Sequence, residues 1–333
     1  MTRLETPPVV TPATSAAFAS VLTPVDRREL LRRFLNIYWL RPENAFWMTL
    51  RSAALSRVDF EPRSIDVACG DGVFSFVHAG GAFDEAFDVF CAVDHLDRVH
   101  SEAADMFDGA ADRYHPLIAR AADWRIDVGT DLKPQLLQKA ASLDFYRETI
   151  EHDSNAPQPF DDHSFATVYS NSAYWMREID ALLHELRRIT RAGGRVILHV
   201  KLKHLTEYNL EAFRPQLGEN FLRIIDRGRK ACWPALGTRA QWERRFSDAR
   251  LDIVHATPFV TRTHAQIWDV GLRPIAPLLV RMANELKPQT RAAIKRDWVA
   301  LFEQLLEPIC DPGFDLFEQS SEPVEMQYVL TPR

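Results

Sequence analysis

The sequence predicts an α/β protein built on a seven-stranded, mostly parallel sheet whose last strand runs antiparallel. From Arg63 onward, short apolar segments alternate with helical patterns, which is typical of a parallel sheet covered by helices on both faces. A loop with two closely spaced glycines follows the first apolar segment. The strand candidates are residues 64–68, 126–129, 148–152, 165–170, 195–200, 251–255 and 325–330.

Two helices are expected before the first strand. Thr23 and Pro24 supply a capping hydroxyl and a proline at the first helical position, and a second helix is expected after Pro42. We therefore expect a helical cap over residues 23–60. Residues 1–22 lack the basic start and apolar core of a signal peptide, and we expect them to form a flexible tail.

Two stretches of the remaining domain, residues 61–333, exceed what the sheet requires. They are residues 83–124 and 257–321, and the second contains a helical pattern between Pro288 and Pro308. Insertions of this length usually carry specificity. We expect both insertions and the N-terminal helices to lie over the carboxyl edge of the sheet.

The bulk composition excludes several classes of partner. A formal net charge of -6 argues against the basic surface that nucleic acids and anionic membranes require. Apolar runs of about 18 residues, which a membrane-spanning helix needs, are absent from the sequence. The four cysteines are far apart and form no CxxC pair, which favours a reducing cytoplasm. A small diffusible partner is the expectation, and a homodimer stays open.

The glycine loop is the sharpest feature of the sequence. The apolar strand of residues 64–68 runs through Cys69 into Gly70 and Gly72, and a helical pattern follows. Glycines at these positions let the backbone approach a ligand, and Asp66 can accept a hydrogen bond from a ligand ammonium group. Ser75 stands where a dinucleotide-binding fingerprint requires its third glycine. A plain tight turn between strand and helix is the alternative interpretation.

Further segments follow this loop in a fixed order. The third strand ends at Asp153 and Ser154, and the fourth strand ends before Asn171. A helix and the pair Gly193-Gly194 precede the fifth strand. Over residues 63–200 this ordered set resembles the class I S-adenosylmethionine (SAM) dependent methyltransferases, which have a Rossmann-like fold. The joint occurrence carries the resemblance, since each motif alone is weak.

The resemblance implies SAM as cofactor, a small molecule as methyl acceptor, and no metal. It places the glycine loop at the methionine end of SAM, an acid of the second strand at the ribose, and the acid after the third strand at the adenine. The implied cofactor-binding residues are Asp66, Ala68, Cys69, Gly70, Gly72, Asp131, Leu132, Asp153, Ser154 and Asn171. Four metal-ligand residue types in the first insertion are better explained as a solvated helix face: Asp94, His95, Asp97 and His100.

Two acids compete for the end of the second strand. The usual spacing of about 20 residues after the glycine loop favours Asp94, which lies 22 residues beyond Gly72 (94 minus 72). The local sequence favours Asp131, because there the acid ends a strand and a helix begins immediately after it. We prefer Asp131, whose distance of 59 residues (131 minus 72) requires residues 83–124 to be an insertion.

A general base is harder to identify. Many relatives place a histidine shortly after the fourth strand, where this chain has aromatic residues and a methionine at 174–176. His199 lies near the carboxyl end of the fifth strand, the edge where open α/β sheets bind ligands, and it is our candidate base. The alternative for His199 is a packed histidine.

Three functions fit the resemblance. The leading one is methyl transfer to an oxygen, less favourably a nitrogen or carbon, of a sugar, lipid precursor or secondary metabolite. A SAM-binding enzyme of another reaction type, such as aminopropyl transfer, is the first alternative. A non-catalytic SAM-binding protein is the second. The acceptor and the pathway are not readable from the sequence.

Overall fold

The computed structural model describes residues 24–93, 106–109, 111–226, 229–311, 313–316 and 322–333. Helices α1 (Pro24–Ile37) and α2 (Pro42–Leu55) precede the sheet, as predicted. The predicted tail lies outside the described residues, and so does Asp94 together with its histidine- and aspartate-containing neighbours.

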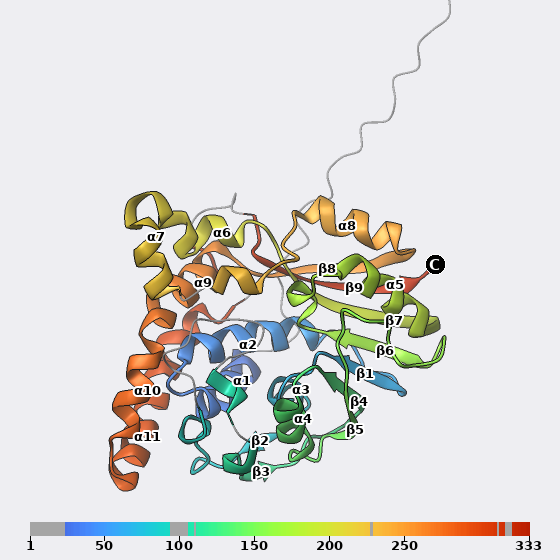
Figure 1. The fold of residues 1–333 in the computed structure, drawn as a ribbon. Coiled ribbons are helices and arrows are strands. Elements are labelled where there is room, and N and C mark those ends of the chain that lie inside the picture. Colours follow the sequence, from blue (N-terminus) through green and yellow to red (C-terminus); the bar gives the residue numbers. More distant parts are fainter. Residues whose placement is uncertain (1–23, 94–105, 110, 227–228, 312, 317–321) are drawn as a thin grey trace, which may run out of the picture.

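One seven-stranded sheet organises the fold, in the order β5-β4-β1-β6-β7-β9-β8 (Figure 1). Strand β9 runs antiparallel to both of its neighbours, and the pairs among the other five adjacent strands are parallel. The predicted Rossmann-like class is therefore confirmed. The strands are β1 (Ser64–Val67), β4 (Ile126–Asp131), β5 (Tyr146–Glu151), β6 (Phe165–Ser170), β7 (Thr190–Lys201), β8 (Leu251–Val260) and β9 (Glu325–Pro332).

All seven predicted strands are present, and five of them, β4, β5, β7, β8 and β9, are longer than expected. Strand β7 begins at Thr190 and takes in Gly193 and Gly194, which were expected in a turn before it. A side chain at Gly194 would lie 2.8 Å from the Ala166 carbonyl oxygen, so glycine allows the two strands to approach closely at this register shift. Strand β8 continues to Val260, so the segment between the last two strands begins later than predicted.

Helices cover both faces of the sheet and form two cores. Successive strand residues point to opposite faces, so Val168 and Leu198 pack with α5 (Ile179–Ile189) and α8 (Arg239–Asp248). Tyr169 and Ile197 pack on the other side, with α1, α2 and α3 (Val73–His78). Helix α4 (Pro134–Ala141) packs against β4 and β5.

The two segments predicted as insertions contact each other beside the sheet, where the Lys295 ammonium donates to the backbone carbonyl oxygens of Glu85 and Phe87. The first is closed by the antiparallel strands β2 (Ala82–Phe83) and β3 (Ile118–Arg120) and contains η1 (Val89–Cys91), η2 (Met106–Asp108) and η3 (Ala111–Arg113). The second contains α9 (Arg262–Gln266), η7 (Ile267–Leu272), η8 (Arg273–Ile275), α10 (Ala276–Asn284), α11 (Pro288–Leu306) and η9 (Glu307–Ile309). Helix α11 confirms the helix predicted between two prolines, and it packs against α1. Figure 1 shows α10 and α11 along the side of the molecule opposite to α5.

The remaining helices follow strands β6 and β7. They are η4 (Ala173–Trp175), α6 (Leu205–Tyr208), η5 (Leu210–Phe213), α7 (Arg214–Ile225) and η6 (Arg229–Cys232). Among the described residues, none of the helices combines the length and the apolar character needed to span a membrane. The division of the chain into tail, cap and one domain with two insertions stays a prediction.

Candidate functional site

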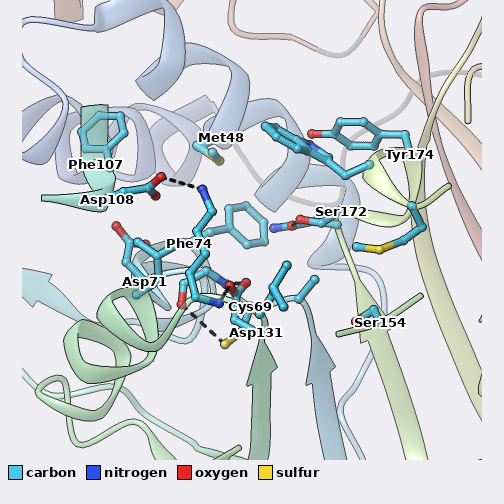
Figure 2. Close-up of a pocket in the computed structure, with 18 of the residues that line it drawn as sticks. Met48, Cys69, Asp71, Phe74, Phe107, Asp108, Asp131, Ser154, Ser172 and Tyr174 are labelled. Carbon is cyan, nitrogen blue, oxygen red and sulfur yellow. Dashed lines mark hydrogen bonds and ion pairs between the residues drawn. The ribbon is translucent and has the colours of Figure 1, made fainter. Parts of the chain in front are cut away.

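A cavity of about 330 Å³ lies at the carboxyl ends of β1, β4, β5 and β6 (Figure 2). Its floor comes from the loops that follow these four strands, and helix α2 lines it from the N-terminal side. Eight of the eleven predicted site residues line it: Ala68, Cys69, Gly70, Asp131, Leu132, Asp153, Ser154 and Asn171. Asp66, Gly72 and His199 are not among the lining residues.

Asp131 ends β4, directly beside β1, and holds the glycine loop. One carboxylate oxygen accepts the backbone N–H of Gly70 and the other accepts that of Lys133, both at 2.9 Å. Burial raises the pKa of Asp131, and these two N–H groups and the Lys133 ammonium partly offset the rise. The second strand of the motif therefore ends at Asp131, as its local sequence predicted.

The two glycines of the loop have different tasks. Both have positive φ, +61° at Gly70 and +73° at Gly72, which favours glycine. A Cβ at Gly70 would have no protein atom within 4 Å, whereas one at Gly72 would lie 2.7 Å from Cε2 of Tyr146. Gly70 therefore faces the cavity. The expectation that Gly72 makes room for a ligand is corrected, since its missing side chain makes room for Tyr146.

Asp66 lies beneath the loop and is fully buried. Its Oδ2 accepts hydrogen bonds from the Ser75 hydroxyl at 2.6 Å and the Tyr146 hydroxyl at 2.8 Å. Burial raises the pKa of Asp66 to about 7. Its Oδ1 has no hydrogen-bond partner in the part of the chain that the structure describes. Asp66 supports the loop from below, and its contact with a ligand ammonium stays a prediction.

The loop after β5 offers unused polar atoms to the cavity. Ser154 Oγ and His152 Nε2 are buried and have no hydrogen-bond partner among the described residues. Asp153 is exposed, and its Oδ1 accepts the backbone and side-chain N–H groups of Asn155. Buried polar atoms are normally paired, so Ser154 Oγ and His152 Nε2 are free to hydrogen-bond a ligand in this cavity.

His199 does not reach the cavity, so the structure contradicts its selection as general base. Its ring is fully buried. The ring Nε2 is hydrogen-bonded to the Gln327 amide oxygen at 2.9 Å, and Nδ1 is hydrogen-bonded to the Tyr169 hydroxyl at 3.3 Å. Burial is the largest effect that lowers the pKa of His199, to about 3. A neutral histidine sealed in the core has no access to an acceptor, and the packed alternative describes it.

The end of the cavity beyond Asn171 is aromatic and cationic, and the sequence did not predict it. Trp47 of α2 and Trp268 of η7 lie 4.9 Å apart between ring centroids. The Arg229 guanidinium lies 5.4 Å from the Trp268 ring and also faces Trp175. All four line the cavity. The aromatic residues after the fourth strand were the one signal for this end of the site.

A buried carboxylate supports the aromatic end from behind. Glu325 of β9 accepts the Arg51 Nε–H at 2.7 Å, the Lys201 ammonium at 2.8 Å and the Trp47 indole N–H at 2.6 Å. Glu325 and Lys201 are almost completely buried, while Arg51 and Trp47 line the cavity. The carboxylate thus fixes the orientation of one cation and one ring at the cavity wall.

Both insertions bring side chains to the cavity. Asp108 of η2 accepts a hydrogen bond from the Lys133 ammonium at 2.6 Å, next to Asp131 (Figure 2). Phe107 lies 5.9 Å from the Tyr38 ring, between centroids. Trp268 comes from the second insertion. Groups of side chains suited to hold a metal ion are absent from the described residues.

Comparison with protein families identifies the domain that carries this site. Residues 110–198 match the family model described as a methyltransferase domain. The chain carries a methyltransferase domain. Such a domain implies an enzyme that uses SAM as its methyl donor. The matched part of the methyltransferase runs to β7 and includes Asp131, Asp153 and Asn171.

Solved structures resemble the methyltransferase in fold. A Thermotoga maritima SAM-dependent methyltransferase, described as a possible histamine N-methyltransferase, is 12% identical, with 92% of this chain and 100% of that chain covered at a TM-score of 0.43. The geranyl diphosphate C-methyltransferase of Streptomyces coelicolor is 12% identical, and the alignment covers 88% of this chain and 82% of that chain at a TM-score of 0.40. A Haloferax volcanii chain solved with the Trm112 methyltransferase activator is 15% identical, and the alignment covers 87% of this chain and 92% of that chain at a TM-score of 0.44. No curated protein matched the chain.

Proposed function

We propose that this enzyme transfers the methyl group of SAM to an oxygen of a small molecule held at the aromatic end of the cavity. The observation that carries the proposal is a single cavity that joins two sets of residues. One set follows the ends of the parallel strands, at Gly70, Asp131 and Ser154. The other set consists of aromatic and cationic side chains from α2, η4, η6 and η7.

The first set fits SAM by its chemistry. The open backbone at Gly70 suits the methionine part, and the Asp131 carboxylate retains lone pairs that can accept ribose hydroxyl groups. Leu132 offers a half-exposed apolar surface to the adenine, and Ser154 and His152 offer polar atoms to its edge. SAM, when bound, supplies a methyl group activated by a sulfonium. The residues of this chain supply alignment, which dominates in-line displacements.

The second set fits a small acceptor. Three tryptophans, Trp47, Trp175 and Trp268, offer flat apolar surfaces, and a secondary metabolite with a ring matches them better than a sugar does. A lipid precursor with an unsaturated chain is the other acceptor of this shape.

The four cysteines carry no disulfide, which supports a cytoplasmic location.

Calorimetry with SAM and with S-adenosylhomocysteine tests the cofactor site. Mass spectrometry of reaction mixtures then tests for a product that has gained one methyl group. We expect binding of both nucleosides, and a methylated product when a suitable acceptor is present. Tighter binding of decarboxylated SAM together with an aminopropylated product would contradict methyl transfer. Failure to bind either nucleoside would contradict the cofactor site itself.

A further inference from the structure

We infer that Tyr174 is the general base of this enzyme and that the acceptor carries the hydroxyl group of a phenol or an enol. The inference rests on the proposed function and adds to it the proton acceptor and the chemical class of the substrate. Tyr174 belongs to η4, directly after the loop of Asn171 and Ser172 that ends β6. Its side chain lines the cavity with 6% of its surface exposed, on the side opposite to Asp108 in Figure 2.

The guanidinium of Arg51 contacts the phenol oxygen of Tyr174. The Arg51 Nη2–H donates a hydrogen bond to Tyr174 Oη at 3.1 Å. Arg51 is held in place by its ion pair with Glu325, in which one carboxylate oxygen accepts the Arg51 Nε–H at 2.7 Å. Because Arg51 occupies an acceptor position of the oxygen, the Tyr174 O–H hydrogen must point elsewhere. The tyrosine therefore presents its proton, or the lone pair left after ionisation, away from Arg51.

A second cation faces the same ring from β7. The Lys201 ammonium lies 4.9 Å from the Tyr174 ring centroid and 4.0 Å from that of Trp47. Lys201 is almost fully buried and donates to Glu325 at 2.8 Å. Together with Arg51, it gives two buried cations against one buried carboxylate. Burial lowers the pKa of Lys201, and its contact with Glu325 opposes this shift. With Lys201 protonated, the three side chains of this cluster carry one net positive charge beside Tyr174.

His199 and Tyr169 leave this balance unchanged because both are neutral. His199 is neutral, since burial lowers its pKa to about 3. Burial raises the pKa of Tyr169, so it stays a neutral phenol. The Arg229 guanidinium lies 5.9 Å from the Trp175 ring centroid, and both side chains line the cavity. The tyrosinate form of Tyr174 would neutralise the Arg51, Lys201 and Glu325 cluster.

The surroundings of Tyr174 lower the pKa of its hydroxyl. Burial by itself raises the pKa of its hydroxyl, but the charges of Arg51 and Lys201 outweigh burial and bring the pKa below 10. Burial raises the pKa of the other tyrosines whose values shift: Tyr114, Tyr146, Tyr169, Tyr208 and Tyr328. Tyr174 is thus the tyrosine whose surroundings favour ionisation.

The proton transfer balances with Tyr174 as tyrosinate. The bond that forms joins the acceptor oxygen to the methyl carbon, and the bond that breaks joins that carbon to sulfur, which keeps the electron pair. The acceptor proton moves to Tyr174 Oη, which becomes a neutral phenol. Tyr174 then loses this proton to a water molecule of the cavity, which restores the tyrosinate, and the hydrogen bond from Arg51 stabilises the anion.

The substrate class follows from the acidity of this base. A base is effective toward a group of comparable pKa, and phenols and enols ionise near the pKa of about 10 that tyrosine itself has. Aliphatic alcohols are far weaker acids. The rings of Trp47, Trp175 and Trp268 can also pack against the planar ring or double bond that such an acceptor carries.

An ultraviolet pH titration of tyrosinate absorbance tests the base without any acceptor. We expect one tyrosine of the wild-type enzyme to ionise at lower pH than the rest, and this component to disappear in Tyr174→Phe. Tyr208→Phe is the matched control, because Tyr208 lies outside the cavity, and it should keep the component. A Tyr174→Phe titration with an unchanged low-pH component would overturn the assignment. Calorimetry with S-adenosylhomocysteine on the same samples reports separately on the proposed cofactor site.

Turnover of a panel of simple phenols, enols, aliphatic alcohols and amines with SAM tests the substrate class. We expect S-adenosylhomocysteine to form with phenols or enols. In Tyr174→Phe, kcat should fall by about 10²- to 10⁴-fold, as for other general bases, while the affinity for S-adenosylhomocysteine is kept. Preference for alcohols or amines, or no turnover of any phenol or enol, would contradict the substrate class. An unchanged kcat in Tyr174→Phe on a phenol would contradict the base.

Discussion

Replacement of Asp131 by alanine should weaken cofactor binding and loosen the glycine loop at once. The carboxylate accepts the Gly70 and Lys133 backbone N–H groups at 2.9 Å each, and we propose that it also accepts a ribose hydroxyl. Each hydrogen bond to a charged group contributes about 1.5–3 kcal/mol. Loss of the ribose contact alone therefore predicts an increase of about tenfold to a hundredfold in the Kd for S-adenosylhomocysteine.

The free energy of unfolding should fall as well, though by less than two such bonds suggest. Burial opposes ionisation of Asp131, and this cost disappears with the carboxylate. We expect a net loss of about 2 kcal/mol, measured by urea unfolding in the absence of ligand. Calorimetry at a temperature where the variant is folded then isolates the effect on binding.

Asp127→Ala is the matched control for Asp131→Ala. Asp127 belongs to the same strand, at the end remote from the cavity, and its Oδ2 accepts the Ser64 backbone N–H at 2.8 Å. This variant should lose stability to a similar degree and keep the wild-type Kd. Wild-type affinity in Asp131→Ala, or an equal loss of affinity in Asp127→Ala, would refute the assignment of the ribose acid.

Three further predictions follow from the cavity and its supports. Burial raises the pKa of Asp66 to about 7, so the folded state keeps a proton that the unfolded state releases near pH 4, and the free energy of unfolding should fall as pH rises from about 4 to 7. In urea unfolding, Asp66→Asn should show a smaller fall over this pH range. Parallel pH dependences of wild type and variant would disprove the prediction. Gly70→Ala and Gly72→Ala should both lower Tm because both glycines have positive φ, and Gly72→Ala should lower it more because its Cβ also meets Tyr146. Gly70→Ala should in addition weaken S-adenosylhomocysteine binding, and the opposite pattern would reverse the two roles. Hydrogen exchange should slow at residues 38–48 and 106–108 when S-adenosylhomocysteine binds if these segments form a lid, and protection confined to the strand-end loops would contradict it.

Much of the sheet was predictable from the sequence because strands such as β1 and β6 are short, buried, mostly apolar runs bounded by turns. Asp131 was predictable because its local sequence specifies a strand end, even though the spacing from Gly72 is unusual. The assignment of His199 as general base was wrong for a physical reason. A position near the carboxyl end of a strand does not show toward which face of the sheet the side chain points. Its side chain points into the core, toward Tyr169 and Gln327.

The aromatic end of the site could not be predicted in the same way. Arg51, Tyr174 and Trp268 come from three elements that lie 123 and 94 residues apart in the chain (174 minus 51 and 268 minus 174), and tertiary packing brings them together. Each looks like an ordinary core residue in its own segment. Lys201 and Glu325 carry no sequence signal either, because buried charges become meaningful only with their partners.

Helix α2 lines the cavity along its length and so limits the length of the molecule that the cavity can hold. The lining residues from Arg41 to Arg51 cover ten steps along this helix and its N-cap, a distance of about 15 Å. Arg41 and Arg51 are fixed at the two ends by ion pairs with Glu43 and Glu325. Between them, Asn44 and Met48 lie one turn apart, and each is only partly buried. Substitution of these two residues would change the shape of the acceptor that fits and would leave the sheet undisturbed. Substrate choice can therefore change through helix α2 alone.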